Sequence, residues 1–139
     1  MPGGPGLPQE RRLRTVIPGP GSLARMARRS EHVAAGVSTT LPVFVEAAGG
    51  GVLVDVDGNS LIDLASGIAV TSVGNAAPEV TDRVVAQARA FTHTCFMVTP
   101  YDGYVDVCEQ LADVTPGDHA KKSVLLNSCL LYTSDAADE

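Results

Sequence analysis

The stretch Val52-Leu53-Val54-Asp55-Val56-Asp57-Gly58-Asn59-Ser60-Leu61-Ile62-Asp63-Leu64 decides the fold of the first half of this 139-residue chain. It places apolar, β-branched runs on both sides of Asp57-Gly58-Asn59. Asp-Gly between such runs is a strong hairpin signal, because Gly takes positive φ at no steric cost. The pattern therefore predicts strands at 52–56 and 61–64, joined by a tight turn.

Two further segments precede this hairpin. Residues 43–46 are typical of a strand, and Gly49-Gly50-Gly51 of the turn that follows it, which predicts a small antiparallel meander of three strands. Before them, the turn cluster Pro18-Gly19-Pro20-Gly21 leads into a predicted helix that reaches about Val33, with Ser22 as its N-cap.

The pattern becomes helical after Pro78. Apolar residues recur there at spacings of three and four, which predicts a helix, and a second helix is predicted over 101–113. Residues 123–127 form a short apolar run typical of a buried parallel strand. In the helix predicted directly after Pro78, the apolar face consists of Val80, Val84, Ala88 and Phe91. The predicted class is α/β: an N-terminal helix, a small antiparallel meander, two helices and the first strand of a larger sheet.

Composition limits the class of protein. The chain is 45% hydrophobic, 19% charged and 4% aromatic, which excludes a disordered polyampholyte, a coiled coil and a collagen-like repeat. Its apolar runs are shorter than the roughly 18 residues that span a bilayer, so no membrane partner is expected. Residues 1–6 lack the apolar core of a secretory signal, and their Pro and Gly do not suit the helix of an organelle transit peptide. We therefore expect a cytoplasmic protein.

Charge and cysteines narrow the partners further. The net charge is −6, although residues 1–30 contain six arginines and a single glutamate, so the rest of the chain is strongly acidic. An acidic body argues against nucleic acid as the main partner. Cys95, Cys108 and Cys129 fit neither a CxxC motif nor a disulfide framework, which predicts reduced thiols.

Two patterns suggest metal or nucleophile chemistry, and neither is complete. Residues 55–63 resemble the start of an EF-hand calcium loop, but Ser66 stands where the loop needs a bidentate Glu. His93-Thr94-Cys95 places a base near a thiol without a third group to orient them, and the histidines and cysteines lack the spacing of a zinc site. We expect no metal, and we expect Cys95 and Phe96 to be packed lining residues.

The connection from Ser66 to Asn75 follows the meander without continuing it. It is rich in small residues and has Gly67 and Gly74 near its ends. Such a connection lets the backbone pass close to another group, either a bound ligand or a packed helix. The residues alone leave both readings open.

Five short motifs carry a resemblance to one enzyme family. They are Gly67-Ile68-Ala69-Val70, Gly74-Asn75, Phe91-Thr92-His93-Thr94-Cys95-Phe96, Tyr101 and Pro116-Gly117-Asp118. Together with the meander sequence they are similar to the N-terminal third of class III, pyridoxal-phosphate-dependent aminotransferases, nearest to the type that acts on 4-aminobutyrate. The resemblance covers residues 11–128.

The resemblance implies a fold, a cofactor and partners. The family has the type I aminotransferase fold, works as a homodimer and uses pyridoxal 5'-phosphate to move the amino group of 4-aminobutyrate, or of a similar terminal amine, to 2-oxoglutarate. By this likeness residues 1–10 are a flexible lead, 11–76 the N-terminal part of the small domain, and 77–128 the start of the cofactor-binding large domain.

The resemblance also implies site residues. Ile68 matches the apolar position that lines the pocket for the carbon chain of the substrate, while Cys95 and Phe96 match positions near the cofactor end of the cleft. Asn127-Ser128 matches the opening of the turn that anchors the cofactor phosphate, where backbone N–H groups at a helix N-terminus bind an anion.

The likeness stops at Cys129, where the family has Gly. Residues 129–139 resemble nothing in the family, and we expect them to be a non-native tail on a truncated reading frame. The Schiff-base Lys, the Asp on the pyridine nitrogen and the Arg for the substrate carboxylate are all expected beyond residue 128. The chain is therefore expected to hold no catalytic residue and to be inactive alone.

Two other functions compete with this interpretation. An acetylornithine or ornithine aminotransferase would share the fold and the cofactor. A non-catalytic interaction module would bind a partner through the basic arm and the sheet, and it should be folded and monodisperse alone. A truncated lobe should instead expose apolar surface.

Overall fold

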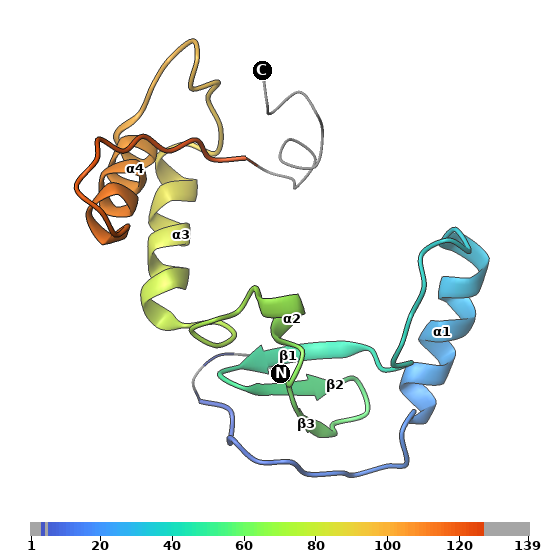
Figure 1. Ribbon diagram of the computed structural model, residues 1–139. Helices are drawn as coiled ribbons and strands as arrows, with labels where there is room; N and C mark the ends of the chain where they lie inside the picture. Colours follow the sequence, from blue (N-terminus) through green and yellow to red (C-terminus); the bar gives the residue numbers. More distant parts are fainter. Residues whose placement is uncertain (1–3, 5, 127–139) are drawn as a thin grey trace. The chain divides into compact units, whose positions relative to one another are not determined.

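The computed structural model describes residue 4 and residues 6–126. In that part of the chain it is an α/β structure with one three-stranded antiparallel sheet and four helices (Figure 1). The chain divides into two compact units, Met1–Ala90 and Phe91–Glu139. Each unit is described by itself below.

The predicted meander is confirmed. Strands β1 (Val45–Gly49), β2 (Val52–Asp55) and β3 (Ser60–Ile62) pair in the order β1-β2-β3, drawn in teal and green in Figure 1. The first strand begins two residues later than predicted, at Val45, and a register shift interrupts its pairing with β2 directly after that residue. The turn at Gly58 has φ +79°, as a tight hairpin requires.

A small apolar core lies against the sheet. Val52 and Val54 point to one face of β2 and are buried, together with Ala47 from β1 and Leu7 from the segment before α1. Gln9 adds polar contacts, since its side chain donates to the carbonyl of Gly49 at 3.0 Å. The end of the predicted flexible lead is thus anchored to the sheet.

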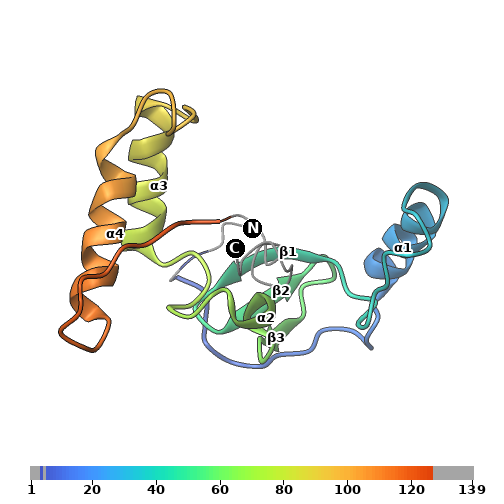
Figure 2. The same ribbon diagram turned by 45° about the horizontal axis from the view of Figure 1, so that its top comes forward.

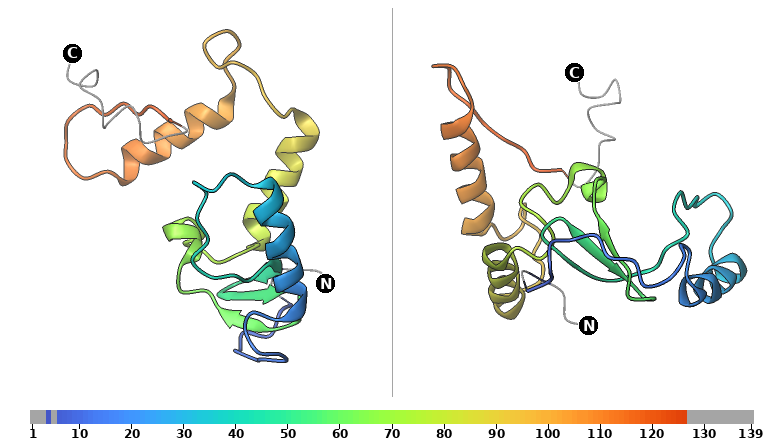
Figure 3. Two further views of the ribbon diagram at one scale, coloured as in Figure 1. Left: turned by 90° about the vertical axis from the view of Figure 1, so that its right-hand side faces the viewer. Right: turned by 90° about the horizontal axis from the view of Figure 1, so that it is seen from below.

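The segment that leads to α1 covers the open edge of the sheet. Arg12 and Ser60 form a two-way backbone bridge, with N···O distances of 3.0 and 2.8 Å. This blue segment runs beside β3 in both views (Figure 1 and Figure 3). It satisfies backbone groups that an edge strand would otherwise present to solvent.

The predicted N-terminal helix is confirmed as α1 (Pro20–His32), but its predicted cap is wrong. Ser22 lies inside the first turn and is buried, and its Oγ accepts a hydrogen bond from the backbone N–H of Phe44 at 3.3 Å. The helix starts earlier because Pro20 has the φ of a first helical residue. Gly19 holds the N-cap position without a side chain to cap it.

The two helices predicted after the meander are confirmed. Helix α3 (Pro78–Ala90) begins at Pro78 and ends one residue before Phe91, and α4 (Asp102–Val114) follows an extended N-cap at Tyr101 (Figure 2). Neither helix contains a buried residue. None of the helices in the described part of the chain is long and apolar enough to cross a membrane.

The strand predicted at 123–127 is wrong for residues 123–126, which are not a strand, while Asn127 lies outside the described residues. A parallel strand needs neighbours for its hydrogen bonds, and residues 91–126 contain no strand that could supply them. The segment instead lies along α4, where the backbone N–H of Leu125 donates to the Tyr104 hydroxyl at 2.8 Å. Cys108 Sγ donates to the carbonyl of Ser123 at 3.6 Å.

Candidate functional site

The loop after β3, residues 63–75, carries the residue predicted to line the substrate pocket. It contains the short helix α2 (Ser66–Ala69), which is separated from the end of β3 by three residues (Figure 2). The side chain of Ile68 is 91% exposed in this unit. An exposed isoleucine presents apolar surface that a ligand or a neighbouring part of the protein can cover.

The four residues of α2 form a left-handed turn. The φ angle is +47° at Ser66 and +62° at each of Gly67, Ile68 and Ala69. Gly adopts such angles freely, whereas every other residue loses roughly 1–2 kcal/mol there, and a β-branched residue such as Ile is the least suited. Such a conformation persists only where the surrounding structure holds it.

Asp63 and Asn75 close this loop at its base. Asp63 Oδ1 accepts hydrogen bonds from the backbone N–H groups of Ala65 at 3.1 Å and Ser66 at 2.8 Å. Asp63 Oδ2 accepts a third from Asn75 Nδ2 at 3.1 Å. Asn75 is tied to the sheet in turn, because its backbone exchanges hydrogen bonds of 2.8 and 2.9 Å with Gly50.

Gly74 brings the loop back to the first turn of the meander. Its φ is +89°, and a Cβ at this position would stand 3.1 Å from the Cα of Gly50. The close approach predicted for this glycine is therefore made to another backbone, within the same unit. The two ends of the loop are held together, since Asp63 N–H also donates to the carbonyl of Gly51 at 2.9 Å.

The second predicted segment contains an aromatic cluster in the other unit. Phe96 stacks on Tyr104 with ring centroids 4.2 Å apart, and it meets Tyr101 edge-on at 5.4 Å. Tyr101 also meets Phe91 edge-on at 5.5 Å. Such pairs stabilise beyond the area they bury, so they fix the ring of Phe96 in place. The prediction that Cys95 is packed is wrong in this unit, because Cys95 is exposed and takes no part in the aromatic cluster.

The predicted site residues fall in different places. Ile68 belongs to the first unit, while Cys95 and Phe96 belong to the second. Asn127 and Ser128 lie outside the described residues. Their assignments to substrate and cofactor stay predictions.

The described residues form no cradle for pyridoxal phosphate. Of their two lysines, Lys121 is partly exposed and Lys122 is exposed, and Lys121 Nζ donates to the carbonyl of Gly117 at 2.6 Å. Nor do three His, Cys, Asp or Glu side chains within residues 4–126 lie close enough to hold a metal ion together. Cys95 and Cys108 are both free thiols, as predicted for them.

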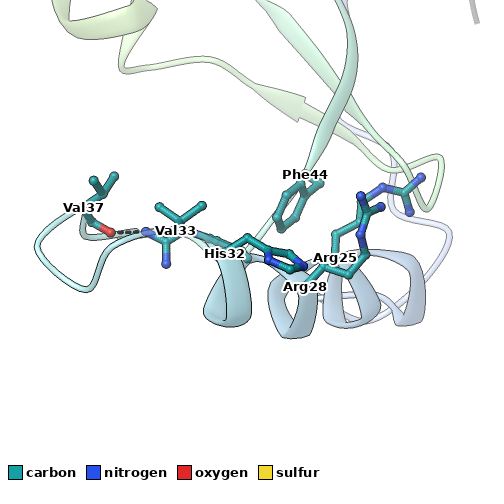
Figure 4. Close-up of a pocket in the computed structure, with 7 residues that line it drawn as sticks. Arg25, Arg28, His32, Val33, Val37 and Phe44 are labelled. Atoms are coloured by element: carbon teal, nitrogen blue, oxygen red, sulfur yellow. Dashed lines mark hydrogen bonds between the residues drawn. The ribbon is translucent and has the colours of Figure 1, made fainter.

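A basic pocket of about 580 Å³ lies between α1 and the segment that follows it. Phe44 sits over the helix, and Arg28 and His32 line the side nearest to it (Figure 4). The guanidinium of Arg29 donates to the carbonyl of Val37. The full lining is Arg25, Arg28, Arg29, His32, Val33, Val37 and Phe44. Ile68, Cys95 and Phe96 do not line this pocket.

The role of Asp57 was missed by sequence reasoning. Its carboxylate caps α1 from the hairpin turn, with Oδ1 accepting from Gly21 N–H at 2.6 Å and Oδ2 from Ser22 N–H at 2.9 Å. Burial raises the pKa of Asp57, but these hydrogen bonds and the nearby Arg25 outweigh it, so the pKa lies below its usual 3.8. A helix that opens on Gly19 without a capping side chain is the signal that an acceptor must come from elsewhere.

A buried polar network inside the hairpin turn was also missed. Asp55 and Asn59 are both 0% exposed. Asp55 Oδ1 accepts from the backbone N–H groups of Asp57 and Asn59, and its Oδ2 accepts from Asn59 Nδ2 at 2.8 Å. Asn59 Oδ1 accepts from Arg14 N–H at 2.7 Å and Thr15 N–H at 2.9 Å. The oxygens in the calcium-like motif thus serve the turn and the segment before α1.

Comparison with known proteins covers most of this chain. The family model for aminotransferase class-III matches residues 33–130. The 4-aminobutyrate aminotransferase of Mycobacterium bovis is 62% identical over 122 residues, which are 88% of this chain and 27% of that protein. That of Mycobacterium leprae is 59% identical over 120 residues, 86% of this chain and 27% of its own length.

A more distant relative carries a different name. The 5-aminovalerate aminotransferase DavT of Pseudomonas putida is 41% identical over 103 residues, which are 74% of this chain and 24% of that protein. The chain therefore spans about a quarter of the length of the curated relatives that it matches.

Proposed function

Because the chain belongs to the class III aminotransferase family, we propose that the whole protein moves the amino group of 4-aminobutyrate to 2-oxoglutarate, with pyridoxal phosphate as its cofactor. The observation that carries this proposal is the 62% identity to a protein named 4-aminobutyrate aminotransferase. Family membership also removes the support for a non-catalytic interaction module.

The names of the relatives favour a straight-chain amine. The mycobacterial relatives are named for 4-aminobutyrate, and the Pseudomonas putida relative for 5-aminovalerate, which is one methylene longer. Both are unsubstituted chains with a carboxylate at one end and an amine at the other, whereas acetylornithine also carries an acetamido group. An acetylornithine or ornithine aminotransferase is therefore the weaker candidate.

The same proposal extends to the architecture. We assign residues 11–76 to the small domain and 77–128 to the start of the large domain of a type I aminotransferase fold. The whole protein is proposed to be a cytoplasmic homodimer. The antiparallel meander and the helices that follow it support the fold assignment, as does the family match over residues 33–130.

Pyridoxal phosphate, when bound, supplies an electron sink and an aldehyde for a lysine amine. The described residues hold neither a phosphate cradle nor a buried lysine, so we place cofactor binding at Asn127, Ser128 and beyond, and assign no chemical step to residues 4–126. Their proposed task is to shape the cleft. Ile68 bounds the carbon chain of the amine, while Cys95 and Phe96 border the cofactor end.

Steady-state kinetics of the whole protein, loaded with pyridoxal phosphate, test the proposed function. Glutamate formed from 2-oxoglutarate is measured with 4-aminobutyrate and with N-acetylornithine as the donor. We expect kcat/KM to favour 4-aminobutyrate by at least about tenfold, because a pocket fitted to a short unbranched chain disfavours a bulkier one. A preference for acetylornithine would overturn the assignment. The 139-residue chain, assayed alongside, is expected to produce no glutamate.

A further inference from the structure

We propose that Asp63 and Asn75 are positioning residues that set the chain-length selectivity of the enzyme. They do so by holding residues 66–69 in the left-handed turn that carries Ile68. This inference rests on the proposed function, because it takes Ile68 as part of the wall around the carbon chain of the amine.

The strained turn is the first observation. Three residues other than Gly, namely Ser66, Ile68 and Ala69, have positive φ in succession around Gly67. A chain released from external restraint would leave this conformation for one that L-residues prefer. The position of the Ile68 side chain therefore depends on whatever holds the turn.

Within the described residues, apolar packing does not hold the turn. Leu64 is 91% exposed and Val70 is 76% exposed, and Ile68 itself is exposed to the same degree as Leu64. The side chains that flank the turn thus make little contact with the rest of the unit. In this part of the chain the restraint comes from hydrogen bonds.

Backbone hydrogen bonds close the turn itself, from Ile68 N–H to the Ala65 carbonyl at 2.7 Å and from Val70 N–H to the Ser66 carbonyl at 2.8 Å. The side-chain hydrogen bonds that tie the turn to the base of the loop converge on one carboxylate. Asp63 Oδ1 binds the N–H groups of Ala65 and Ser66 at the entrance of the turn, and Asp63 Oδ2 binds Asn75 Nδ2 at the exit of the loop. Asn75 is fixed by its backbone pair with Gly50. One side chain therefore joins the entrance of the turn to a backbone anchored on the sheet. Asp63 and Asn75 are both partly buried, as are the bonds from Ser66 and Asn75, whereas the bond from Ala65 is exposed.

A displaced wall changes selectivity more than it changes chemistry. One methylene in an apolar pocket discriminates between substrates by roughly 10–200-fold. If Ile68 moves, the space for the carbon chain changes, and 4-aminobutyrate loses its advantage over 5-aminovalerate. Because the wall contacts the carbon chain in both the bound substrate and the transition state, the change should fall mainly on KM.

Asn75→Asp breaks the bond between the two side chains in the most direct way. It places a second carboxylate at the position of Asn75 Nδ2, 3.1 Å from Asp63 Oδ2. The double variant Asp63→Asn/Asn75→Asp reverses the polarity of the pair. A side-chain N–H of the new residue 63 can then donate to the carboxylate at 75, while its oxygen still accepts from Ala65 and Ser66.

The test measures kcat and KM of the whole protein, loaded with pyridoxal phosphate, for 4-aminobutyrate and 5-aminovalerate. For Asn75→Asp we expect the ratio of the two kcat/KM values to fall roughly tenfold, mostly through KM. The double variant should restore the ratio to within about twofold, since coupled residues deviate from additivity. Val73→Ala, at a position in the same loop that is 73% exposed, serves as the matched control and should leave the ratio unchanged.

The outcomes separate the two proposals. If the unchanged protein does not use 4-aminobutyrate, the proposed function fails and this inference fails with it. If it does, but Asn75→Asp keeps the wild-type ratio or the double variant does not restore it, the inference alone is overturned. Pyridoxal phosphate content should stay near wild type in all variants. Should Asn75→Asp not fold, Asn75→Ala removes the same hydrogen bond without adding a charge. The ratio of its kcat/KM values for 4-aminobutyrate and 5-aminovalerate then tests the inference.

Discussion

In the hairpin turn of the meander, Asp55 and Asn59 are fully buried and their polar atoms are paired with one another and with the segment before α1. In α3 and α4 no residue is buried, and Val84, on the apolar face of α3, is 60% exposed. The hairpin turn thus finds partners for its buried polar atoms within its own unit. The helices carry apolar faces that their own units do not cover, as expected of elements that pack against other parts of a larger protein.

The sharpest way to break this comparison is Asn59→Ala in the whole protein. The change removes the acceptor for two backbone N–H groups and the donor to Asp55 Oδ2, all within a buried turn. We expect the free energy of unfolding to fall by about 3 kcal/mol, since buried polar groups without partners are strongly destabilising. Chemical denaturation measures it, and Gln110→Ala, an exposed amide on α4, is the control. A loss no larger than that of the control would show that the turn does not depend on this network.

A smaller effect is expected in the aromatic cluster of the second unit. Tyr104→Leu keeps an apolar side chain but removes the stack with Phe96 and the hydrogen bond from Leu125 N–H. The expected loss is about 1–2 kcal/mol, from the ring pair and the hydrogen bond together. Tyr104→Phe keeps the stack and should lose less than half of that. Equal losses in the two variants would mean that the hydroxyl, and not the stack, holds this region.

Acid should weaken the cap of α1, because that cap depends on the ionised carboxylate of Asp57. The pKa of Asp57 in the folded chain lies below 3.8, its value in the unfolded chain. A depressed folded pKa gives stability that is fully present above 3.8 and is lost as the pH falls from there through the folded value. Hydrogen exchange of the Gly21 and Ser22 amides, followed across that acid range, measures the loss. Asp57→Asn should remove this pH dependence, and an unchanged profile in that variant would contradict the role given to the carboxylate.

The smallest effect is expected on the exposed face of α3. Val84→Ser in the 139-residue chain should change the free energy of unfolding by less than about 0.5 kcal/mol, because the side chain is mostly exposed. It should also reduce the binding of a hydrophobic dye, since it removes part of the uncovered apolar face. A loss above about 1 kcal/mol would mean that this face is packed, and the contrast with the hairpin turn would disappear.

The sequence predicted the meander, α1, α3 and α4 because each has a local signal. Asp-Gly marks the hairpin, and apolar spacings of three and four mark the two later helices. The cap of α1 could not be predicted in this way, since the carboxylate of Asp57 reaches it from 35 residues further along the chain. The strand at 123–127 was predicted from apolarity alone, and such a run becomes a strand only where other strands pair with it.

In the candidate site, too, the features with a local sequence signal were predicted and those that depend on distant contacts were not. Gly67 and Gly74 marked the loop, and the family likeness pointed to Ile68. The bond between Asp63 and Asn75 joins residues 12 positions apart, without a motif to announce it. Ordinary propensities argue against positive φ at Ile68, so the left-handed turn lay beyond any reading of local sequence.

The bridge from Asn59 to Arg14 also bears on the order in which the chain assembles. Asp55 and Asn59 are four positions apart in the sequence, whereas Asn59 and Arg14 are 45 positions apart. Short loops form within microseconds, and a longer loop loses more chain entropy before its contacts compensate. The segment before α1 should therefore dock late, onto a turn that already exists. Until it docks, Asn59 and Ser60 lack their partners in that segment, and the edge of β3 is the place where a newly made chain is most exposed to pairing with another copy of itself.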